Sequence, residues 1–392
     1  MIGMTLCSGI GAPEVAAPWV DWRFASEIEA FPRAVLQSRF GYKSPDDHNQ
    51  GDPLLWGDMT EVTPDLLRAR GIPLPDLLVA GTPCQAFSIA GLRKGVEDAR
   101  GSLTLKFVET CHAIVDARPD GKLAVVWENV PGVLSDKGNA FGCFLGGLVG
   151  AVDPVLPSPK PREGKSTDFW KWHKGGKSEV LDEDGEPTGK FEILEPHHRP
   201  KWPREGMVQG PRARAAWSVL DAKWFGVAQR RRRVFVVIDF GGAVDPAQIL
   251  LEPDRLRGDS PPCRKTGEGV AGTLNARTNG GGGLGTDFEL SGGLQVSNSG
   301  DTSFCLAASA QQSLDAETET LIATCATGDI TQVRRLMPVE CARLQGFSDD
   351  HTEIEYRGKP AADGPQYKAY GNSMAVPVMK WILDRVKEQT NA

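Results

Sequence analysis

The sequence lacks the features of membrane, disulfide-rich secreted and zinc-ribbon proteins. No apolar stretch approaches the roughly 20 residues needed to cross a bilayer. The eight cysteines are scattered and none forms a Cys-x-x-Cys pair, which argues against a zinc ribbon and against a disulfide framework. The N-terminus has no basic segment ahead of an apolar core, so no signal peptide is predicted. A reducing cytoplasm is the expected compartment.

Positive charge is also scarce. The chain has 44 Lys and Arg against 51 Asp and Glu, a formal net charge of -7. This balance leans mildly against a nucleic-acid binder, but a local basic groove is enough to contact phosphates. The 392 residues exceed what one core usually serves, so two domains are expected.

The first part of the chain alternates short apolar runs with helical stretches, the pattern of a doubly wound, mostly parallel α/β sheet. Such sheets carry their chemistry at the carboxyl ends of the strands. Strands are expected at 2–6, 23–26, 77–80, 123–127 and 234–239.

Two later regions differ in composition. Residues 155–215 are rich in Pro, Lys and Trp, and we interpret them as an insertion with long surface loops. Trp170, Trp172 and Trp202, with interleaved lysines, fit either stacking on nucleic acid or pinning the insertion to its own domain. Residues 241–333 are rich in Gly, Ser and Thr and resemble a separate, loop-rich β region.

A glycine-containing turn follows the first expected strand. Gly9-x-Gly11 suits close approach of a nucleotide cofactor, although Glu14 stands where the dinucleotide fingerprint has its third glycine. Glu27 ends the second strand, where such folds place a carboxylate for ribose hydroxyls. An ordinary turn and a solvated Glu are the alternatives.

Three further strand ends carry reactive or charged groups. Cys84 follows Gly81-Thr82-Pro83 on a turn that would expose a nucleophile, although many cysteines are only buried structural residues. Glu128 ends an apolar strand, where desolvation would raise its pKa. In extended backbone, Gln229, Arg231 and Arg233 share one face, which predicts either a ligand-facing arginine pair or a salt-bridged sheet edge.

Together these stretches resemble the DNA cytosine-5 methyltransferase family. The resemblance rests on motifs in the family's order along nearly the whole chain. They are Gly81-Thr82-Pro83-Cys84-Gln85, Asp98-Ala99-Arg100-Gly101-Ser102-Leu103, Glu128-Asn129-Val130, Gln229-x-Arg231-x-Arg233, Arg334-x-Leu336-x-Pro338-x-Glu340-Cys341 and Gly371-Asn372-Ser373.

The resemblance implies a role for each site residue. As catalytic residues, Cys84 would attack C6 of cytosine, Glu128 would hold N3 and the 4-amino group, Arg233 would touch O2 and Arg231 would support the nearby backbone. S-adenosylmethionine would be the methyl donor. Its site would be formed by Cys7, Gly9 and Gly11 beside the cofactor, Glu27 at the ribose, Asp58 at the adenine, and Leu103 and Asn372 at the methionine end. The family usually has Phe where Cys7 stands and a third glycine where Ala12 stands.

The resemblance also implies a Rossmann-like catalytic domain over 1–240, a target-recognition domain over 241–350 and a returning segment over 360–392. Duplex DNA is the expected partner of a monomeric enzyme; the sequence leaves open whether a cognate restriction endonuclease exists. A tRNA methyltransferase of the same family and a nicotinamide-dependent oxidoreductase are the alternatives. No metal is expected.

Overall fold

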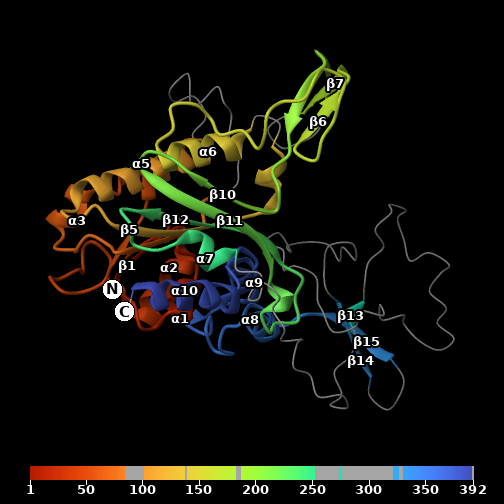
Figure 1. The fold of residues 1–392 in the computed structure, drawn as a ribbon. Helices are drawn as coiled ribbons and strands as arrows, with labels where there is room; N and C mark the ends of the chain where they lie inside the picture. The colour runs from red at the N-terminus through yellow and green to blue at the C-terminus, as the bar shows by residue number, and fades with distance from the viewer. Residues whose placement is uncertain are drawn as a thin grey trace.

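The computed structural model describes residues 1–83, 101–136, 139–181, 187–251, 273–274, 321–325 and 330–390. Its centre is an eight-stranded sheet in the order β10-β11-β12-β5-β4-β1-β2-β3 (Figure 1). The strands β5, β4, β1, β2 and β3 run parallel, and β12, β11 and β10 continue the sheet antiparallel. The bounds are β1 (Ile2–Leu6), β2 (Asp21–Ser26), β3 (Leu54–Trp56), β4 (Leu77–Ala80), β5 (Leu123–Asn129), β10 (Glu205–Gln209), β11 (Ala213–Asp221) and β12 (Arg232–Phe240). The predicted doubly wound α/β class is confirmed.

The central strands are buried on both faces because their side chains alternate between two cores. Ala124 and Val126 of β5 belong to one hydrophobic cluster, and Val125 and Trp127 belong to the other. This period of two, with apolar residues at every position, is typical of a strand covered by helices on both sides.

Helices form a layer on each face of the sheet (Figure 1). The cluster that contains Trp127 is completed by α3 (Pro64–Ala69), α5 (Gly101–Ala117) and α6 (Ala140–Val149). The opposite cluster is completed by α1 (Ala12–Ala16), α2 (Ala30–Phe40), α7 (Pro246–Leu250), α8 (Pro338–Gln345), α9 (Asp363–Asn372) and α10 (Val376–Thr390). The C-terminal helix α10 therefore packs on the N-terminal helix α1, which closes the α/β unit.

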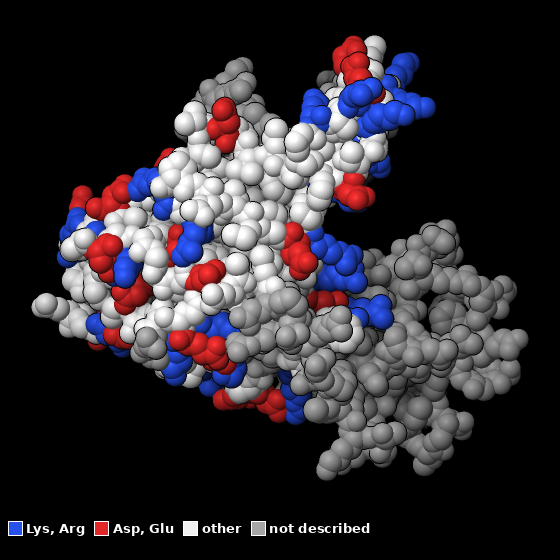
Figure 2. Space-filling view, in the orientation of Figure 1, with Lys and Arg blue, Asp and Glu red and all other residues white. Residues whose placement is uncertain are grey.

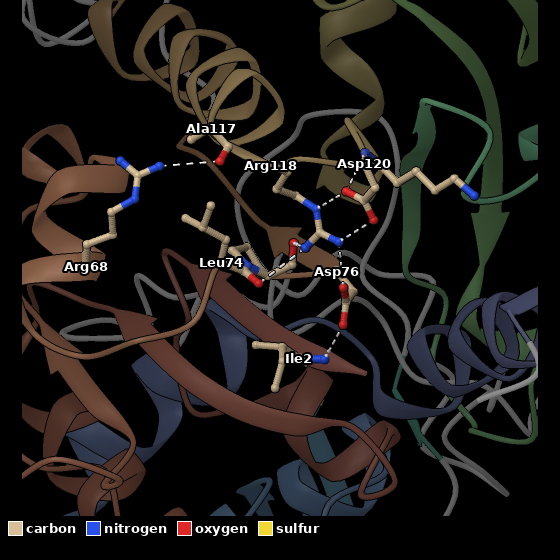
Figure 3. Close-up of polar contacts among 9 residues, drawn as sticks. Ile2, Arg68, Leu74, Asp76, Ala117, Arg118 and Asp120 are labelled. Atoms are coloured by element: carbon tan, nitrogen blue, oxygen red, sulfur yellow. Dashed lines mark hydrogen bonds and ion pairs between the residues drawn. The ribbon is translucent and has the colours of Figure 1, made fainter.

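The amino ends of the parallel strands are joined by one guanidinium (Figure 3). Arg118 lies 2.9 Å from Asp76 and 3.0 Å from Asp120, and Asp76 accepts the backbone N–H of Ile2 at 2.7 Å. The two carboxylates neutralise the largely buried arginine, as buried charges require. This network holds the edge of the sheet opposite the strand ends where chemistry is expected.

The expectation of long loops over 155–215 is correct for residues 155–169, which contain no helix or strand, and wrong for most of the rest. The segment contains β6 (Trp170–His173), β7 (Gly176–Leu181), β8 (Pro187–Leu194) and β9 (His197–Pro200), paired as β6-β9 and β7-β8. It also contains β10 and the start of β11, which belong to the main sheet. Residues 170–200 are thus a pair of two-stranded ribbons.

Most of the predicted target-recognition region lies outside the described residues, so its boundaries remain a prediction. Its described part comprises a small sheet of β13 (Thr273–Leu274), β14 (Leu321–Cys325) and β15 (Ile330–Arg335), together with α7 and α8, which pack on the core of the α/β body. The remaining short elements are β16 (Glu355–Tyr356), β17 (Lys359–Pro360) and the 3-10 turns η1 (Met59–Glu61), η2 (Pro131–Ser135) and η3 (Ala222–Trp224). No helix among the described residues is long and apolar enough to span a membrane.

Candidate active site

The candidate site lies where the parallel strands end. The loops after β1, β2, β4 and β5 meet the segment between α9 and α10 there, because strands that run in one direction present their carboxyl ends at one edge of the sheet. A cavity between these loops is lined by Gly9, Gly81, Glu128, Asn372 and Met374, among others. Chain segments more than 350 residues apart in sequence therefore contribute to one site.

Glu128 and Arg233 form an ion pair at this edge. Arg233 Nε lies 3.2 Å from Glu128 Oε1, and their side chains are 16% and 11% exposed. Burial raises the pKa of the Glu128 carboxyl, while the positive charges of Arg233 and Arg231 act in the opposite direction. The carboxyl group therefore retains a proton to higher pH than an exposed Glu, as an acid aimed at a ring nitrogen requires.

Arg231 acts on the backbone. Its side chain is 3% exposed, and Nη2 donates to the carbonyls of Gly371 at 2.9 Å and Ser373 at 2.7 Å. These contacts tie the start of β12 to the turn that presents Asn372. Gln229 is buried as well, whereas Arg230 and Arg232 are exposed, so the predicted alternation of faces is confirmed.

The turn that precedes the expected nucleophile is fixed by β5. Trp127 Nε1 donates to Thr82 Oγ1 at 2.8 Å, and Asn129 Nδ2 donates to the Thr82 carbonyl at 2.9 Å. A Cβ on Gly81 would lie 2.8 Å from Met374 Cε, so a larger residue would not fit without displacing Met374. Cys84 itself lies outside the described residues, and its catalytic role remains a prediction.

The loop after β1 is held against Glu27. Gly9 N–H donates to Glu27 Oε2 at 2.8 Å, and Glu29 N–H donates to Oε1 at 2.8 Å. Burial raises the pKa of Glu27, and these backbone donors oppose that shift. Gly9 has a φ of 55°, and no atom lies within 4 Å of where its Cβ would be, so the loop is open toward the site.

Gly11 and Cys7 shape the same loop. Gly11 has a φ of 83°, and a Cβ there would collide with the ring of Phe40. Cys7 Sγ contacts Met59 Sδ at 3.4 Å, where the family usually has an aromatic ring. Burial, together with the Glu27 and Asp58 carboxylates, raises the pKa of the Cys7 thiol to about 12, so this thiol is no nucleophile.

Two cavities adjoin Gly9. One has a volume of about 290 Å³ and extends from Glu27 to Phe31, Tyr356 and Lys368; Lys368 Nζ pairs with Glu29 at 2.9 Å on its wall. The other has a volume of about 40 Å³ and reaches Glu128. Gly9 and Asn372 line both, so an elongated ligand bound there would pass between these two residues.

The remaining predicted residues, Asp58 and Leu103, line neither cavity. Asp58 is exposed and caps the η1 turn, where its Oδ1 accepts from Thr60 N–H at 2.8 Å. Leu103 packs on the core at the start of α5. Their cofactor roles remain predictions.

The sequence pattern does not predict that Glu14 is a structural residue of the site. Its carboxyl is 3% exposed, and Oε1 accepts from Thr5 Oγ1 at 3.0 Å and from the Tyr42 hydroxyl at 3.1 Å. Oε2 has no hydrogen-bond partner among the residues that the structure describes. Thr5 also bonds Ser8 in the loop after β1, so Glu14 supports that loop from below. Burial raises the pKa of Glu14 to about 7.

This shift predicts a pH dependence of stability. The folded state holds a proton that the unfolded state releases near its ordinary pKa of about 4.3, so stability falls as the pH rises from about 4 through 7. We expect Glu14→Gln to remove this slope, so the variant gains up to about 3 kcal/mol over the natural protein between pH 5 and pH 8. Urea unfolding at both pH values measures the difference. Parallel pH profiles for the two proteins would contradict a buried, protonated Glu14.

The geometry and the sequence together place the chain in a family. The model of the C-5 cytosine-specific DNA methylase family matches residues 3–147 and 272–388, so the chain belongs to this family, as the motifs predict. It is 38% identical to the DNA N-6-adenine-methyltransferase of Escherichia phage P1, over 97% of this chain and 60% of that protein. The chain therefore spans about 60% of the length of that relative.

Two other similarities are spread over the whole chain. The type II methyltransferase M.HpaII of Haemophilus parainfluenzae is 25% identical over 98% of this chain and 88% of its own length. The structural alignment with the crystal structure of the S. pombe Dnmt2 methyltransferase covers 100% of this chain and 100% of that chain, with a TM-score of 0.56 and 13% sequence identity. The latter is a similarity of fold alone.

Proposed function

We propose that the chain transfers a methyl group from S-adenosylmethionine to carbon 5 of a cytosine flipped out of duplex DNA, through a covalent bond between Cys84 and C6. The observation that carries the proposal is the buried pair of Glu128 and Arg233 beside Gly81, three residues before Cys84 in the chain. Such a pair offers a proton donor and a cationic donor to one polar ring edge. Family membership supports the reaction type.

The cavities beside Gly9 fit the methyl donor. A buried carboxylate whose oxygens already accept two backbone N–H groups keeps lone pairs for ribose hydroxyls, which supports Glu27 as the residue that would bind the ribose. Gly9, Gly11 and Cys7 would flank the cofactor, Asp58 would bind adenine, and Leu103 and Asn372 would bound its methionine end. When bound, S-adenosylmethionine supplies an electrophilic methyl group.

The residues of the chain make C5 reactive. Addition of the Cys84 thiolate to C6 breaks the ring's conjugation and gives C5 the character of an enamine carbon. Glu128 donates its proton toward N3 and offsets the charge that develops on the ring, and Arg233 donates to O2. After methylation, a base removes the C5 proton and the C6–S bond breaks, which restores the thiolate and the aromatic ring.

The base must leave the helix for this chemistry. A cytosine stacked in a duplex is out of reach of a side chain in a cavity, and extrusion costs a few kcal/mol. Contacts that the described cavity makes with the extruded ring would offset this cost.

Duplex DNA with 5-fluorocytosine in place of cytosine tests the covalent step. Fluorine at C5 cannot leave as the proton does, so the thiol remains bound to C6 after methylation. We expect an adduct that survives denaturing electrophoresis when S-adenosylmethionine is present and that is absent with unmodified DNA. An active enzyme that forms no adduct would contradict the covalent mechanism.

Methylation of adenine N6 is a second candidate, because the phage P1 relative carries that activity in its name. Nucleoside analysis of DNA methylated with a labelled methyl group separates the two products. We expect 5-methylcytosine; N6-methyladenine as the sole product would overturn the proposal. The same assay on duplex RNA and tRNA tests the RNA alternative.

A further inference from the structure

Residues 155–204 form an arm between α6 and β10, and the proposed reaction uses none of its residues. The arm projects from the α/β body, and Lys and Arg side chains gather along it (Figures 1 and 2). Between 160 and 177 there are six basic residues and two acidic ones, whereas 178–194 holds one basic and six acidic residues. Along the chain, basic residues therefore predominate over 160–177 and acidic residues over 178–194.

Trp202 attaches this arm to the body. Its side chain is 6% exposed, its backbone N–H donates to the Leu134 carbonyl at 3.0 Å, and its Nε1 donates to Asn139 Oδ1 at 3.0 Å. Trp170 is 4% exposed and donates to the Ser158 carbonyl at 3.0 Å. Of the two interpretations of these tryptophans, attachment of the insertion to the body is therefore correct for Trp202, whereas Trp170 is buried within the arm itself.

The β6-β9 ribbon has two unlike faces. One face carries Trp170, Trp172, His198 and Pro200, and the ring of Trp172 lies 4.6 Å from that of His198. The other face carries Lys171 opposite Arg199 and His173 opposite His197. We call the second set the cationic face; the exposed Lys174 and Lys177 follow it in the chain, directly after β6 and in β7.

Like charges lie opposite one another on the cationic face. Lys171 and Arg199 are cross-strand partners, an arrangement that destabilises a ribbon unless an anion lies between or over them. Among the residues that the structure describes, no carboxylate is within ion-pair distance of Lys171, Lys174, Lys177 or Arg199. Arg199 Nε donates instead to His197 Nε2 at 3.1 Å, and His197 Nδ1 lies 2.7 Å from the Glu195 carbonyl. None of these four side chains is therefore neutralised by a carboxylate of the described residues, and the imidazole of His197 holds Arg199 in place.

We propose that the cationic face binds the phosphate backbone of duplex DNA beside the target cytosine, an inference that rests on the proposed function. In a chain of net charge -7, a ribbon whose Lys171 and Arg199 have no carboxylate partner among the described residues offers a local positive charge that attracts a polyanion. Contacts of this kind are independent of base sequence and fix the position of the duplex.

A matched pair of triple variants tests the proposal. The arm variant is Lys171→Gln/Lys174→Gln/Lys177→Gln. The control variant is Lys43→Gln/Lys122→Gln/Lys380→Gln, whose lysines lie on the α/β body. Both variants make the same change in net charge, and thermal unfolding checks that both remain folded.

The readout is the affinity for a fluorescent duplex of mixed sequence, roughly 40 base pairs long, between about 50 and 200 mM salt. We expect the arm variant to bind about tenfold or more weakly at the lower salt. The slope of log K against log salt should fall in magnitude by about 0.9 for each phosphate that the variant no longer neutralises. The control variant should bind like the natural protein. Equally weakened binding by both variants, or unchanged binding by the arm variant, would overturn the assignment of the arm.

Two further outcomes separate the arm from the proposed function. If the natural protein methylates cytosine in DNA and the arm variant keeps its full affinity for duplex DNA, only the proposed role of the arm is wrong. If the natural protein binds duplex RNA but not duplex DNA, both the DNA partner and the proposed function are wrong.

Discussion

Replacement of Glu128 by Gln is expected to lower kcat for cytosine methylation by about 10²- to 10⁴-fold, the range that one positioned acid contributes. Glutamine keeps the size of the side chain but cannot deliver a proton to a ring nitrogen. Burial raises the pKa of Glu128, so the proton is retained to higher pH than on an exposed Glu and is lost as the pH rises through that raised value. Activity that depends on this proton therefore falls on the alkaline side in the natural protein.

Single-turnover transfer of a tritiated methyl group measures this effect, and the KM for S-adenosylmethionine should change little. Glu109→Gln on α5 is the matched control, because it removes an exposed carboxylate that pairs with Lys106 at 3.5 Å. Loss of the ion pair with Arg233 could also loosen the site, and unchanged cofactor binding would exclude that explanation. A kcat within about threefold of the natural value would remove Glu128 from the proton transfer.

The positions of the catalytic groups at strand ends could be predicted from the sequence, but their pairing could not. Apolar runs that stop at Leu6, Ala80 and Glu128 locate one edge of a parallel sheet. The contact of Glu128 with Arg233 depends on β12 lying antiparallel to β5, with Phe235 opposite Glu128. That register follows from the three-dimensional strand order, and no local pattern encodes it.

Glu14 and the arm show the same limit in two forms. An acid in the first turn of a helix usually faces solvent, and only the packing of Tyr42 against α1 reveals that Glu14 is buried. In the arm, the alternation of Trp170, Lys171 and Trp172 does signal a strand. This alternation covers only a few residues and lies among prolines, so the overall composition of the segment predicts a loop instead.

Arg231 joins the two halves of the site. Its contacts with Gly371 and Ser373 lie 140 and 142 residues away in sequence, so the loop that holds Asn372 depends on the strand that positions Arg233. The proposed methyl-donor site and base site are therefore built on one rigid connection. The hydrogen bonds of Arg231 thus help to explain why motifs from both ends of the chain line a single cavity.

Replacement of Cys84 by Ala is expected to reduce methyl transfer by at least about 10⁴-fold while cofactor binding stays near its natural value, because only the bond to C6 is lost. The four other thiols whose surroundings the structure describes cannot substitute for it. Burial raises the pKa of Cys7, Cys111, Cys143 and Cys341, which keeps each of them as a neutral thiol.

The matched control for Cys84→Ala is Cys143→Ala, which removes a buried thiol of α6 outside the cavities and should retain methyl transfer. Calorimetry with S-adenosylmethionine confirms that the Cys84 variant still binds the methyl donor, and 5-fluorocytosine DNA should no longer be trapped by it. Thr82, fixed by Trp127 and Asn129, leads the chain toward residue 84 from the same edge of the sheet that carries Glu128. Turnover by the Cys84 variant would mean that C5 is activated without a thiolate. The proposed covalent mechanism at the carboxyl edge of the sheet would then be wrong.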